Sequence, residues 1–250
     1  MDSKQRVWRP GTQKKMRADW DDRARENAFY YIASSKEDWD PADFYASGEQ
    51  SVEEIIRPDM DEICRGRSPA KMRVLEIGCG AGRMTRALAG IFGEVHGVDV
   101  SGEMVAQGRE LLADIPNAHL HRNSGADLQV LGDLRFDFAF SFIVFQHIPS
   151  QAIIENYIRE VQRVLRPGSL FKFQVQGSSQ VTVSEEDTWI GAPISSPLTE
   201  ELAERNGFEL LRGQGVEEQY FWLWFLKPDR LQMWCKAAEA DGWFEGMRRR

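Results

Sequence analysis

The sequence predicts an α/β protein with a doubly wound, mostly parallel sheet of seven strands. We expect a C-terminal antiparallel hairpin to close this sheet and an N-terminal helical lid to precede it. Short apolar runs alternate with helical stretches from Lys71 onward, which is typical of βαβ units. A glycine-rich turn follows the first run. The last two runs are joined by a segment too short for a helical crossover, so they are predicted to pair antiparallel.

Taken in order, the short runs rich in β-branched and aromatic residues are predicted as strands over 73–77, 94–100, 119–122, 136–143, 169–176, 208–212 and 220–226. Helices are predicted over 82–92, 101–112, 151–165 and 199–205. Ser101 is the expected N-cap of the second helix, with Glu103 favourably placed in its first turn. Pro167 and Gly168 are expected to end the third helix, because proline cannot continue it and glycine permits the turn.

The ends of the chain differ in composition from this core. Residues 20–61 interleave aromatic side chains with carboxylates, which favours an ordered helical lid. We therefore divide the chain into a lid or extension at 1–69, a core at 70–228 and a helical tail at 229–250. The first 17 residues carry six Lys or Arg against one Asp, which is typical of a solvated tail; a nucleic-acid or membrane contact is the alternative.

The composition limits the possible classes of protein. The 250 residues are 42% hydrophobic and 28% charged, which indicates a soluble globular protein, and no apolar run approaches the roughly 18 residues of a membrane span. A net charge of −8 makes nucleic acid an unlikely partner, since binding to phosphate backbones needs a basic face. Met1 is followed by a charged stretch rather than an apolar signal sequence, so we expect a cytoplasmic protein. We further expect a monomer or a homodimer.

Neither the cysteines nor most of the histidines form a recognisable motif. The three cysteines are far apart in the sequence, which predicts neither a disulfide framework nor a zinc site. His96, His119 and His121 lie on or beside strands without a convincing ligand set. We therefore predict no metal site and assign these histidines no role.

The strongest motif is the turn Glu76-Ile77-Gly78-Cys79-Gly80-Ala81-Gly82 between the first strand and helix. Glycines at this point let the backbone approach a ligand closely, although a plain strand–helix turn uses the same residues. Asp99, at the end of the second strand, lies about 20 residues after the turn, where an acid accepts hydrogen bonds from ribose hydroxyls. Arg83 stands where the dinucleotide-binding pattern requires glycine, which counts against a nicotinamide cofactor.

With these motifs, residues 70–228 resemble the class I S-adenosylmethionine-dependent methyltransferases of small-molecule type. The resemblance implies a Rossmann-like fold and S-adenosyl-L-methionine as cofactor. It also implies that the glycine turn lies against the methionine moiety, Asp99 binds ribose and the next residues pack on adenine. The cofactor-binding residues carried over in this way are Glu76, Gly78, Cys79, Gly80, Gly82, Asp99, Val100, Met104, Ala126, Asp127 and Ser141.

The resemblance further implies a methyl transfer to a small-molecule acceptor. Strand four lacks the N-P-P-Y type sequence that methyltransferases of adenine and glutamine amide nitrogens use, which disfavours those acceptors. His147, just past strand four, is the best candidate for a catalytic base, with a structural hydrogen bond as the alternative. The candidate lid and substrate residues, which could also be simple packing residues, are Trp20, Tyr30, Tyr31 and Trp189.

Two other functions remain open at this point. A regulatory protein that binds the cofactor without turnover would keep the same turn and the same acid. A nicotinamide-dependent oxidoreductase on a related fold is less favoured because of Arg83.

Overall fold

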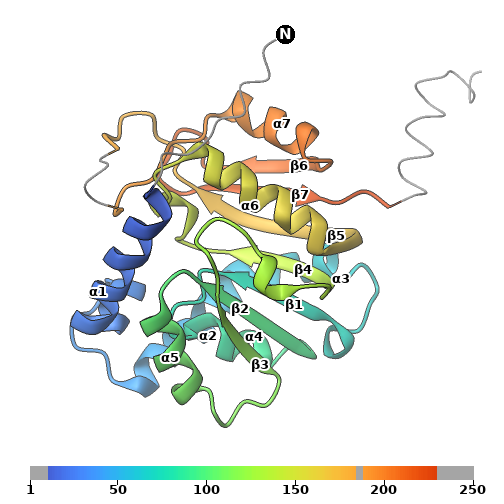
Figure 1. Cartoon of the computed structure of the whole chain (residues 1–250). Helices are drawn as coiled ribbons and strands as arrows, with labels where there is room; N and C mark the ends of the chain where they lie inside the picture. Colours follow the sequence, from blue (N-terminus) through green and yellow to red (C-terminus); the bar gives the residue numbers. More distant parts are fainter. Residues whose placement is uncertain (1–10, 184–187, 230–250) are drawn as a thin grey trace, which may run out of the picture.

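A computed structural model of the chain describes residues 11–183 and 188–229 (Figure 1). Its centre is one seven-stranded sheet in the order β3-β2-β1-β4-β5-β7-β6. The strands are β1 (Arg73–Ile77), β2 (Glu94–Asp99), β3 (Ala118–Arg122), β4 (Phe136–Ser141), β5 (Leu165–Val175), β6 (Glu209–Gln214) and β7 (Phe221–Leu226). The first five strands are parallel, and β7 runs antiparallel to both of its neighbours, β5 and β6, as expected for the closing hairpin.

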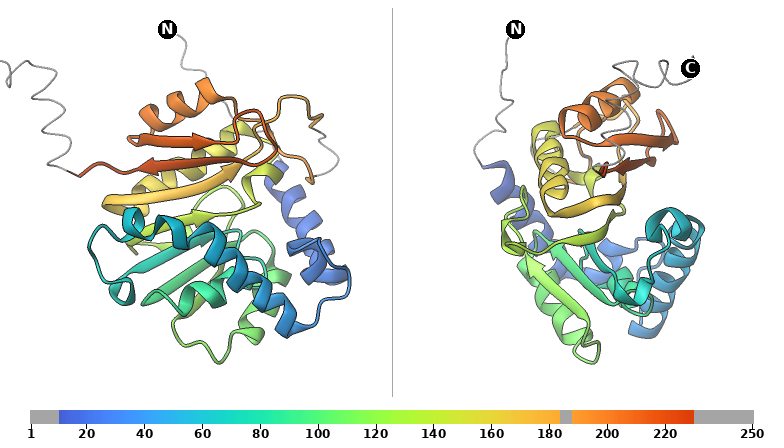
Figure 2. Two further views of the ribbon diagram at one scale, coloured as in Figure 1. Left: turned by 180° about the vertical axis from the view of Figure 1, so that it is seen from behind. Right: turned by 90° about the vertical axis from the view of Figure 1, so that its right-hand side faces the viewer.

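Helices cover both faces of the sheet (Figure 2). Residues of α2 (Pro41–Ile55), α3 (Met60–Cys64) and α4 (Arg83–Ala89) share one apolar cluster with β1, β2 and β4. The helix α5 (Gly102–Leu111) packs beside them on Leu120 of β3. The opposite face packs against α6 (Gln151–Val164) and α7 (Ser196–Arg205), around a core of phenylalanines from β4, β5 and β7. The predicted doubly wound fold is therefore confirmed.

The N-terminal helix α1 (Thr12–Ile32) stands at the carboxyl ends of the strands, beside α5 (Figure 1). It is kinked at Asn27, whose φ of −163° is not helical and whose side chain accepts a hydrogen bond from the Tyr30 N–H at 3.1 Å. Of the residues that the structure describes, none lies in a helix long and apolar enough to cross a membrane.

Most predicted elements match within a few residues, and β5 is the main difference. Its prediction began at residue 169, whereas the observed strand begins at Leu165, directly after α6. Leu165 pairs with Phe136, and the Gly168 N–H donates to the Lys227 carbonyl at 2.7 Å. The residues around Pro167 therefore belong to the strand rather than to a turn before it. The predicted tail helix lies outside the described residues, except for its first residue, and the three-part division of the chain stays a prediction.

Candidate functional site

The glycine turn after β1 is held against the two neighbouring strands. The N–H groups of Gly78 and Cys79 both donate to the Val98 carbonyl of β2, at 2.7 and 3.1 Å. Gly78 has a φ of +76°, and a Cβ at this position would lie 2.1 Å from Val144 Cγ2. Only glycine satisfies both conditions, because any side chain would be strained and would collide with the segment after β4.

Asp99 links the end of β2 to this turn. Its carboxylate accepts hydrogen bonds from the N–H groups of Gly80 and Ser101, both at 2.9 Å. Burial raises the pKa of Asp99, and the backbone donors oppose that shift. Because each oxygen accepts only one of these bonds, the carboxylate keeps acceptor capacity for a ligand hydroxyl.

Glu76 is a buried carboxyl group at the end of β1. It accepts a hydrogen bond from the Thr85 hydroxyl at 2.5 Å. Burial raises its pKa to about 7, against the hydrogen bond from Thr85 and the charge of Arg83, which both lower it. A carboxyl with this pKa is only partly ionised near neutral pH, so a positively charged ligand group would draw it into the charged form.

Arg83, the first residue of α4, is also buried. One terminal nitrogen donates to the Ser47 carbonyl and the Ser51 hydroxyl of α2, both at 3.0 Å. Its Nε is buried and has no hydrogen-bond partner within the described part of the chain. An unpaired buried guanidinium N–H is costly, and a ligand carboxylate is the group that would satisfy it best.

These groups line a pocket at the carboxyl ends of β1, β2 and β4, where open α/β sheets bind ligands. The pocket encloses about 900 Å³ of empty space, counting its open mouth. Of the residues predicted to bind the cofactor or the acceptor, it brings together Glu76, Gly78, Cys79, Gly80, Asp99, Val100, Met104, His147, Trp20 and Tyr31.

The helix α1 covers one side of this pocket. Its Asp21 carboxylate accepts hydrogen bonds from the Ser101 hydroxyl at 2.7 Å and from the Glu103 N–H at 3.3 Å, at the start of α5. Ala24 and Ala28 pack against Met104. Of the predicted lid, the helix α1 is therefore held beside the pocket, at the point where Asp99 and the start of α5 meet.

His147 lies in the short helix η4 (Phe145–His147) after β4. Its Nδ1–H donates to the Trp189 carbonyl, and its Nε2 lies 3.3 Å from the Gln146 side-chain nitrogen. The ring centroid is 5.3 Å from that of Trp20 and 5.0 Å from that of Trp189. The histidine is thus enclosed between the lid helix and the segment that contains Trp189.

A second pocket adjoins the first and encloses about 1730 Å³, open solvent included. The two pockets share Tyr31, Ile32, Arg83, Ile143 and His147. The second pocket is rich in neutral polar side chains, and these are Ser34, Ser35, Ser47, Gln50, Ser51, Gln146, Gln176, Ser178 and Gln219. It has the character of a binding site for a polar ligand beside the first pocket.

The backbone is strained where the pockets meet. Ile143 has a φ of +54°, an unfavourable conformation for a β-branched residue, and its N–H donates to the Gln174 side chain at 3.0 Å. Strain of this kind costs of order 1–3 kcal/mol and is often found at functional sites.

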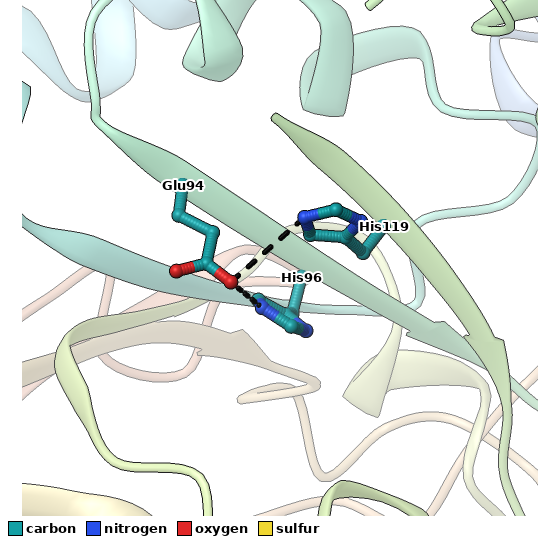
Figure 3. Close-up of side chains that lie close together, drawn as sticks. All are labelled: Glu94, His96 and His119. Carbon is teal, nitrogen blue, oxygen red and sulfur yellow. Dashed lines mark hydrogen bonds and ion pairs between the residues drawn. The ribbon is translucent and has the colours of Figure 1, made fainter. Parts of the chain in front are cut away.

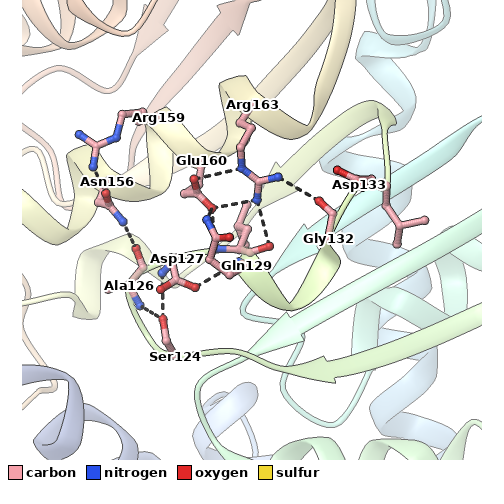
Figure 4. Close-up of polar contacts among 12 residues, drawn as sticks. Ser124, Ala126, Asp127, Gln129, Gly132, Asp133, Asn156, Arg159, Glu160 and Arg163 are labelled. Atoms are coloured by element: carbon pink, nitrogen blue, oxygen red, sulfur yellow. Dashed lines mark hydrogen bonds and ion pairs between the residues drawn. The ribbon is translucent and has the colours of Figure 1, made fainter.

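Some predicted cofactor residues do not line the first pocket. Gly82 caps α4, Ser141 donates its hydroxyl to the Ile77 carbonyl at 3.0 Å, and Ala126 is buried in the core. The Asp127 carboxylate accepts from the Gln129 N–H within its own loop, which Glu160 and Arg163 of α6 hold in place (Figure 4). Among the aromatics, Trp189 lines only the second pocket, and Tyr30 is outside the lining of both.

The pocket also contains residues that the sequence analysis did not assign. Arg83 was noted only as a departure from the dinucleotide pattern, although its place directly after the turn could have suggested contact with a ligand. Asn123 and Tyr157 are joined by a hydrogen bond of 2.9 Å between the amide and the hydroxyl. They come from the end of β3 and from α6, and no motif in the sequence connects them.

Comparison with known proteins agrees with this geometry. Residues 74–168 match a family model described as a methyltransferase domain. The demethylmenaquinone methyltransferase of Staphylococcus aureus (strain MRSA252) is 31% identical over 102 residues, which are 40% of this chain and 41% of that protein. The chain therefore spans about two fifths of the length of this curated relative.

Solved structures share the fold over most of the chain. A complex of DhpI with S-adenosylhomocysteine (SAH) has a TM-score of 0.60 at 17% identity, covering 89% of this chain and 100% of that one. Magnesium protoporphyrin IX methyltransferase from Synechocystis PCC 6803, also with bound SAH, has a TM-score of 0.59 at 16% identity, covering 86% and 99%. Residues 74–168, from β1 to the start of β5, are therefore similar to a methyltransferase domain, and the solved structures show the same fold over most of the chain.

Proposed function

We propose that this protein is a methyltransferase that uses S-adenosyl-L-methionine to methylate a polar small molecule. The observation that carries the proposal is the pair of adjoining pockets that meet at His147 and Arg83. The first pocket offers the residues expected for the cofactor, and the second offers space for an acceptor beside it. A protein that only bound the cofactor would need no second pocket.

The residues of the first pocket fit each part of this cofactor. Ionised Glu76 suits the ammonium group of its methionine moiety, and the guanidinium of Arg83, which lines the pocket, suits the carboxylate. Asp99 retains acceptor capacity for the ribose hydroxyls. Val100 and Met104 provide an apolar surface for adenine next to it.

The bound cofactor supplies a methyl group on a positively charged sulfur, which makes it ready for displacement. The chain then has to place the acceptor atom in line with the methyl carbon, and positioning of this kind contributes up to ~7 to 11 kcal/mol. Ile143, whose backbone is strained at the junction of the pockets, lies where that alignment would be set. The rings of Trp20 and Trp189 beside His147 help to exclude water there.

His147 is suited to take a proton from the acceptor. The Trp189 carbonyl accepts the Nδ1–H, which leaves Nε2 as the basic nitrogen of the neutral ring. The Gln146 amide that donates to Nε2 lines the second pocket, so an acceptor hydroxyl or amine would take its place on Nε2. A positioned base of this kind adds roughly 10² to 10⁴-fold to the rate.

The second pocket offers polar groups to an acceptor, beside aromatic and apolar residues such as Trp189 and Ile190. Its walls carry serine hydroxyls and glutamine amides from α2, from the end of β5 and from residues near 178 and 219. These groups are suited to an acceptor with several hydroxyl or amide groups. The curated relative is named for a quinone acceptor, but its match covers only part of the core.

The setting that we propose is the cytoplasm, and the described cysteines, Cys64 and Cys79, support it because both are free thiols. We also propose that the protein is a monomer or a homodimer.

The proposal is tested by calorimetric titration of the full-length protein with SAH, alongside NADH and NADPH. We expect saturable one-to-one binding of SAH and none of the nicotinamides. Binding of a nicotinamide instead would overturn the cofactor assignment. A screen of polyhydroxylated and amide-containing acceptors with methyl-labelled cofactor then tests turnover, and transfer to apolar quinones alone would overturn the acceptor class.

A further inference from the structure

Three of the four histidines of the chain lie together on one face of the sheet, away from the pockets. In the parallel register, His96 of β2 pairs directly with His119 of β3. Alternate residues of a strand share a face, so Glu94 lies on the same face as His96, and His121 on the same face as His119. The sequence shows no spaced motif because these side chains come from separate strands.

The cluster is accessible because, among the described elements, no long helix covers this part of the sheet. Between β3 and β4 the chain forms only the three-residue helix η3 (Gln129–Leu131). The His119 side chain is 42% exposed and Glu94 is 31% exposed, whereas His96 is only 6% exposed. The cluster lies toward the amino ends of the strands, opposite the edge that carries Asp99. It is therefore separate from the site described above.

The side chains converge as metal ligands would (Figure 3). One ligand atom from each of Glu94, His96 and His119 lies within 4.8 Å of the others. Glu94 Oε1 is 2.8 Å from His96 Nε2 and 3.8 Å from His119 Nε2. The other oxygen of Glu94 accepts from the Arg73 Nε at 2.7 Å, which orients the carboxylate and leaves Oε1 facing both rings.

His121 contacts the second ring nitrogen of His96. Its Nε2 lies 3.0 Å from His96 Nδ1. Without a metal ion, the His96 Nε2–H donates to Glu94 Oε1 at 2.8 Å. In the other tautomer the Nδ1–H of His96 donates to His121, and the lone pair of Nε2 is then free for an ion that replaces the proton. Histidine ligands of metals are usually held by such a hydrogen bond from their second nitrogen.

We propose that Glu94, His96 and His119 form a binding site for a zinc ion, with His121 as the positioning residue of His96. Two imidazoles and one carboxylate are a common zinc donor set, and solvent would complete the tetrahedral shell. Mg²⁺ and Ca²⁺ prefer oxygen ligands, and here the Arg73 guanidinium partly neutralises the one carboxylate. The ion would join the edge strand β3 to β2.

The test is a zinc titration of chelator-treated full-length protein in competition with a chromophoric zinc indicator. We expect one equivalent of Zn²⁺ to bind and to raise the melting temperature, and Mg²⁺ to have no effect. The variant His119→Gln changes an exposed side chain, so it should fold, as circular dichroism would verify. We expect it to weaken zinc binding at least ~tenfold, and His121→Gln to weaken it by ~10 to 100-fold.

The matched control is His147→Gln, which removes the one histidine outside the cluster. It should keep zinc affinity and the rise in melting temperature. Wild-type affinity in the His119→Gln protein would refute the site, as would an equal loss in the His147→Gln protein. If no zinc binds at all, Glu94 and the histidines form only a hydrogen-bonded network, and the proposal fails. None of these readouts depends on methyl transfer.

Discussion

Glu76 should make cofactor binding depend on pH. If its carboxylate holds the ammonium group of the ligand, then only the ionised form binds well. Burial places the pKa of Glu76 at about 7 in the unliganded protein, so binding must expel its proton at lower pH. The affinity for SAH should therefore fall as the pH decreases through 7, whereas an ordinary glutamate would have no effect in this range.

The size of the effect follows from that pKa. The apparent dissociation constant grows by the factor 1 + 10^(pKa − pH), which is about 1.3 at about pH 7.5 and about 11 at about pH 6 for a pKa of about 7. SAH should thus bind about eightfold more weakly at the lower pH. About 0.9 proton should be released for each SAH bound at about pH 6, because that fraction of Glu76 is protonated beforehand.

The assay is calorimetry at both pH values, in buffers that differ in ionisation enthalpy, with Glu76→Gln as the matched variant. The glutamine side chain can still accept the Thr85 hydrogen bond but carries no charge. The variant should bind SAH roughly 10 to 100-fold more weakly at about pH 7.5, which corresponds to the loss of a charged hydrogen bond. It should also lose the proton release. If the wild-type protein shows no proton release, or the variant retains it, the reasoning about Glu76 is wrong.

The raised pKa of Glu76 makes folding stability fall as the pH rises, whereas it makes the affinity for SAH increase. A carboxyl whose pKa rises from 4.5 to about 7 on folding keeps its proton in the folded protein and loses it in the unfolded chain. Burial of Glu76 therefore leaves the free energy of unfolding unchanged below about pH 4.5 and lowers it progressively as the pH rises. Above about pH 7 the reduction reaches its full value of about 3 kcal/mol. Glu76→Gln should raise the melting temperature of the unliganded protein at about pH 8 while it weakens the cofactor site.

The remaining predictions concern three other positions. Asp99→Ala should weaken SAH binding roughly 10 to 100-fold through loss of a charged acceptor, and calorimetry showing unchanged affinity in a folded variant would contradict the ribose assignment. His147→Ala should lower turnover roughly 10² to 10⁴-fold with little change in SAH affinity, whereas equal losses of both in kinetic and binding assays would indicate a structural role. Gly78→Ala places a Cβ 2.1 Å from Val144 Cγ2, so this variant should be clearly destabilised in thermal unfolding. The control is Gly132→Ala, where φ is also positive but no atom of the described residues lies within 4 Å of the new Cβ, and its loss of stability should be smaller. Equal losses in the two variants would rule out the clash as the cause.

Much of the fold could be predicted because its signals are local. The strand at 73–77 matches β1 residue for residue, and Ser101 caps α5 through a 3.1 Å hydrogen bond from the Met104 N–H, as predicted. The wrong start of β5 shows the limit of local signals. Pro167 and Gly168 indicate a helix end correctly, but only the pairing with β4 and the contact with Lys227 extend the strand back to Leu165.

The candidate site was predictable where one short segment holds the residues. The glycine turn is continuous in sequence, and Asp99 follows it at a regular spacing, so their approach follows from the βαβ unit. The loop after β3 could not be placed from sequence because side-chain contacts decide its course. Asp127 is held within its loop, beside α6, whereas Asn123 lines the pocket and bonds to Tyr157.

Sequence patterns alone were therefore enough for the order of the elements, the glycine turn and the acid after β2, because these depend on neighbouring residues and strand periodicity. Only the tertiary structure decided the rest. It buried Glu76 and raised its pKa, left the Arg83 Nε unpaired among the described residues and enclosed His147 between Trp20 and Trp189. Parallel register likewise brought His96 and His119 together. Burial and register are set by packing between segments far apart in the chain, which no local pattern records.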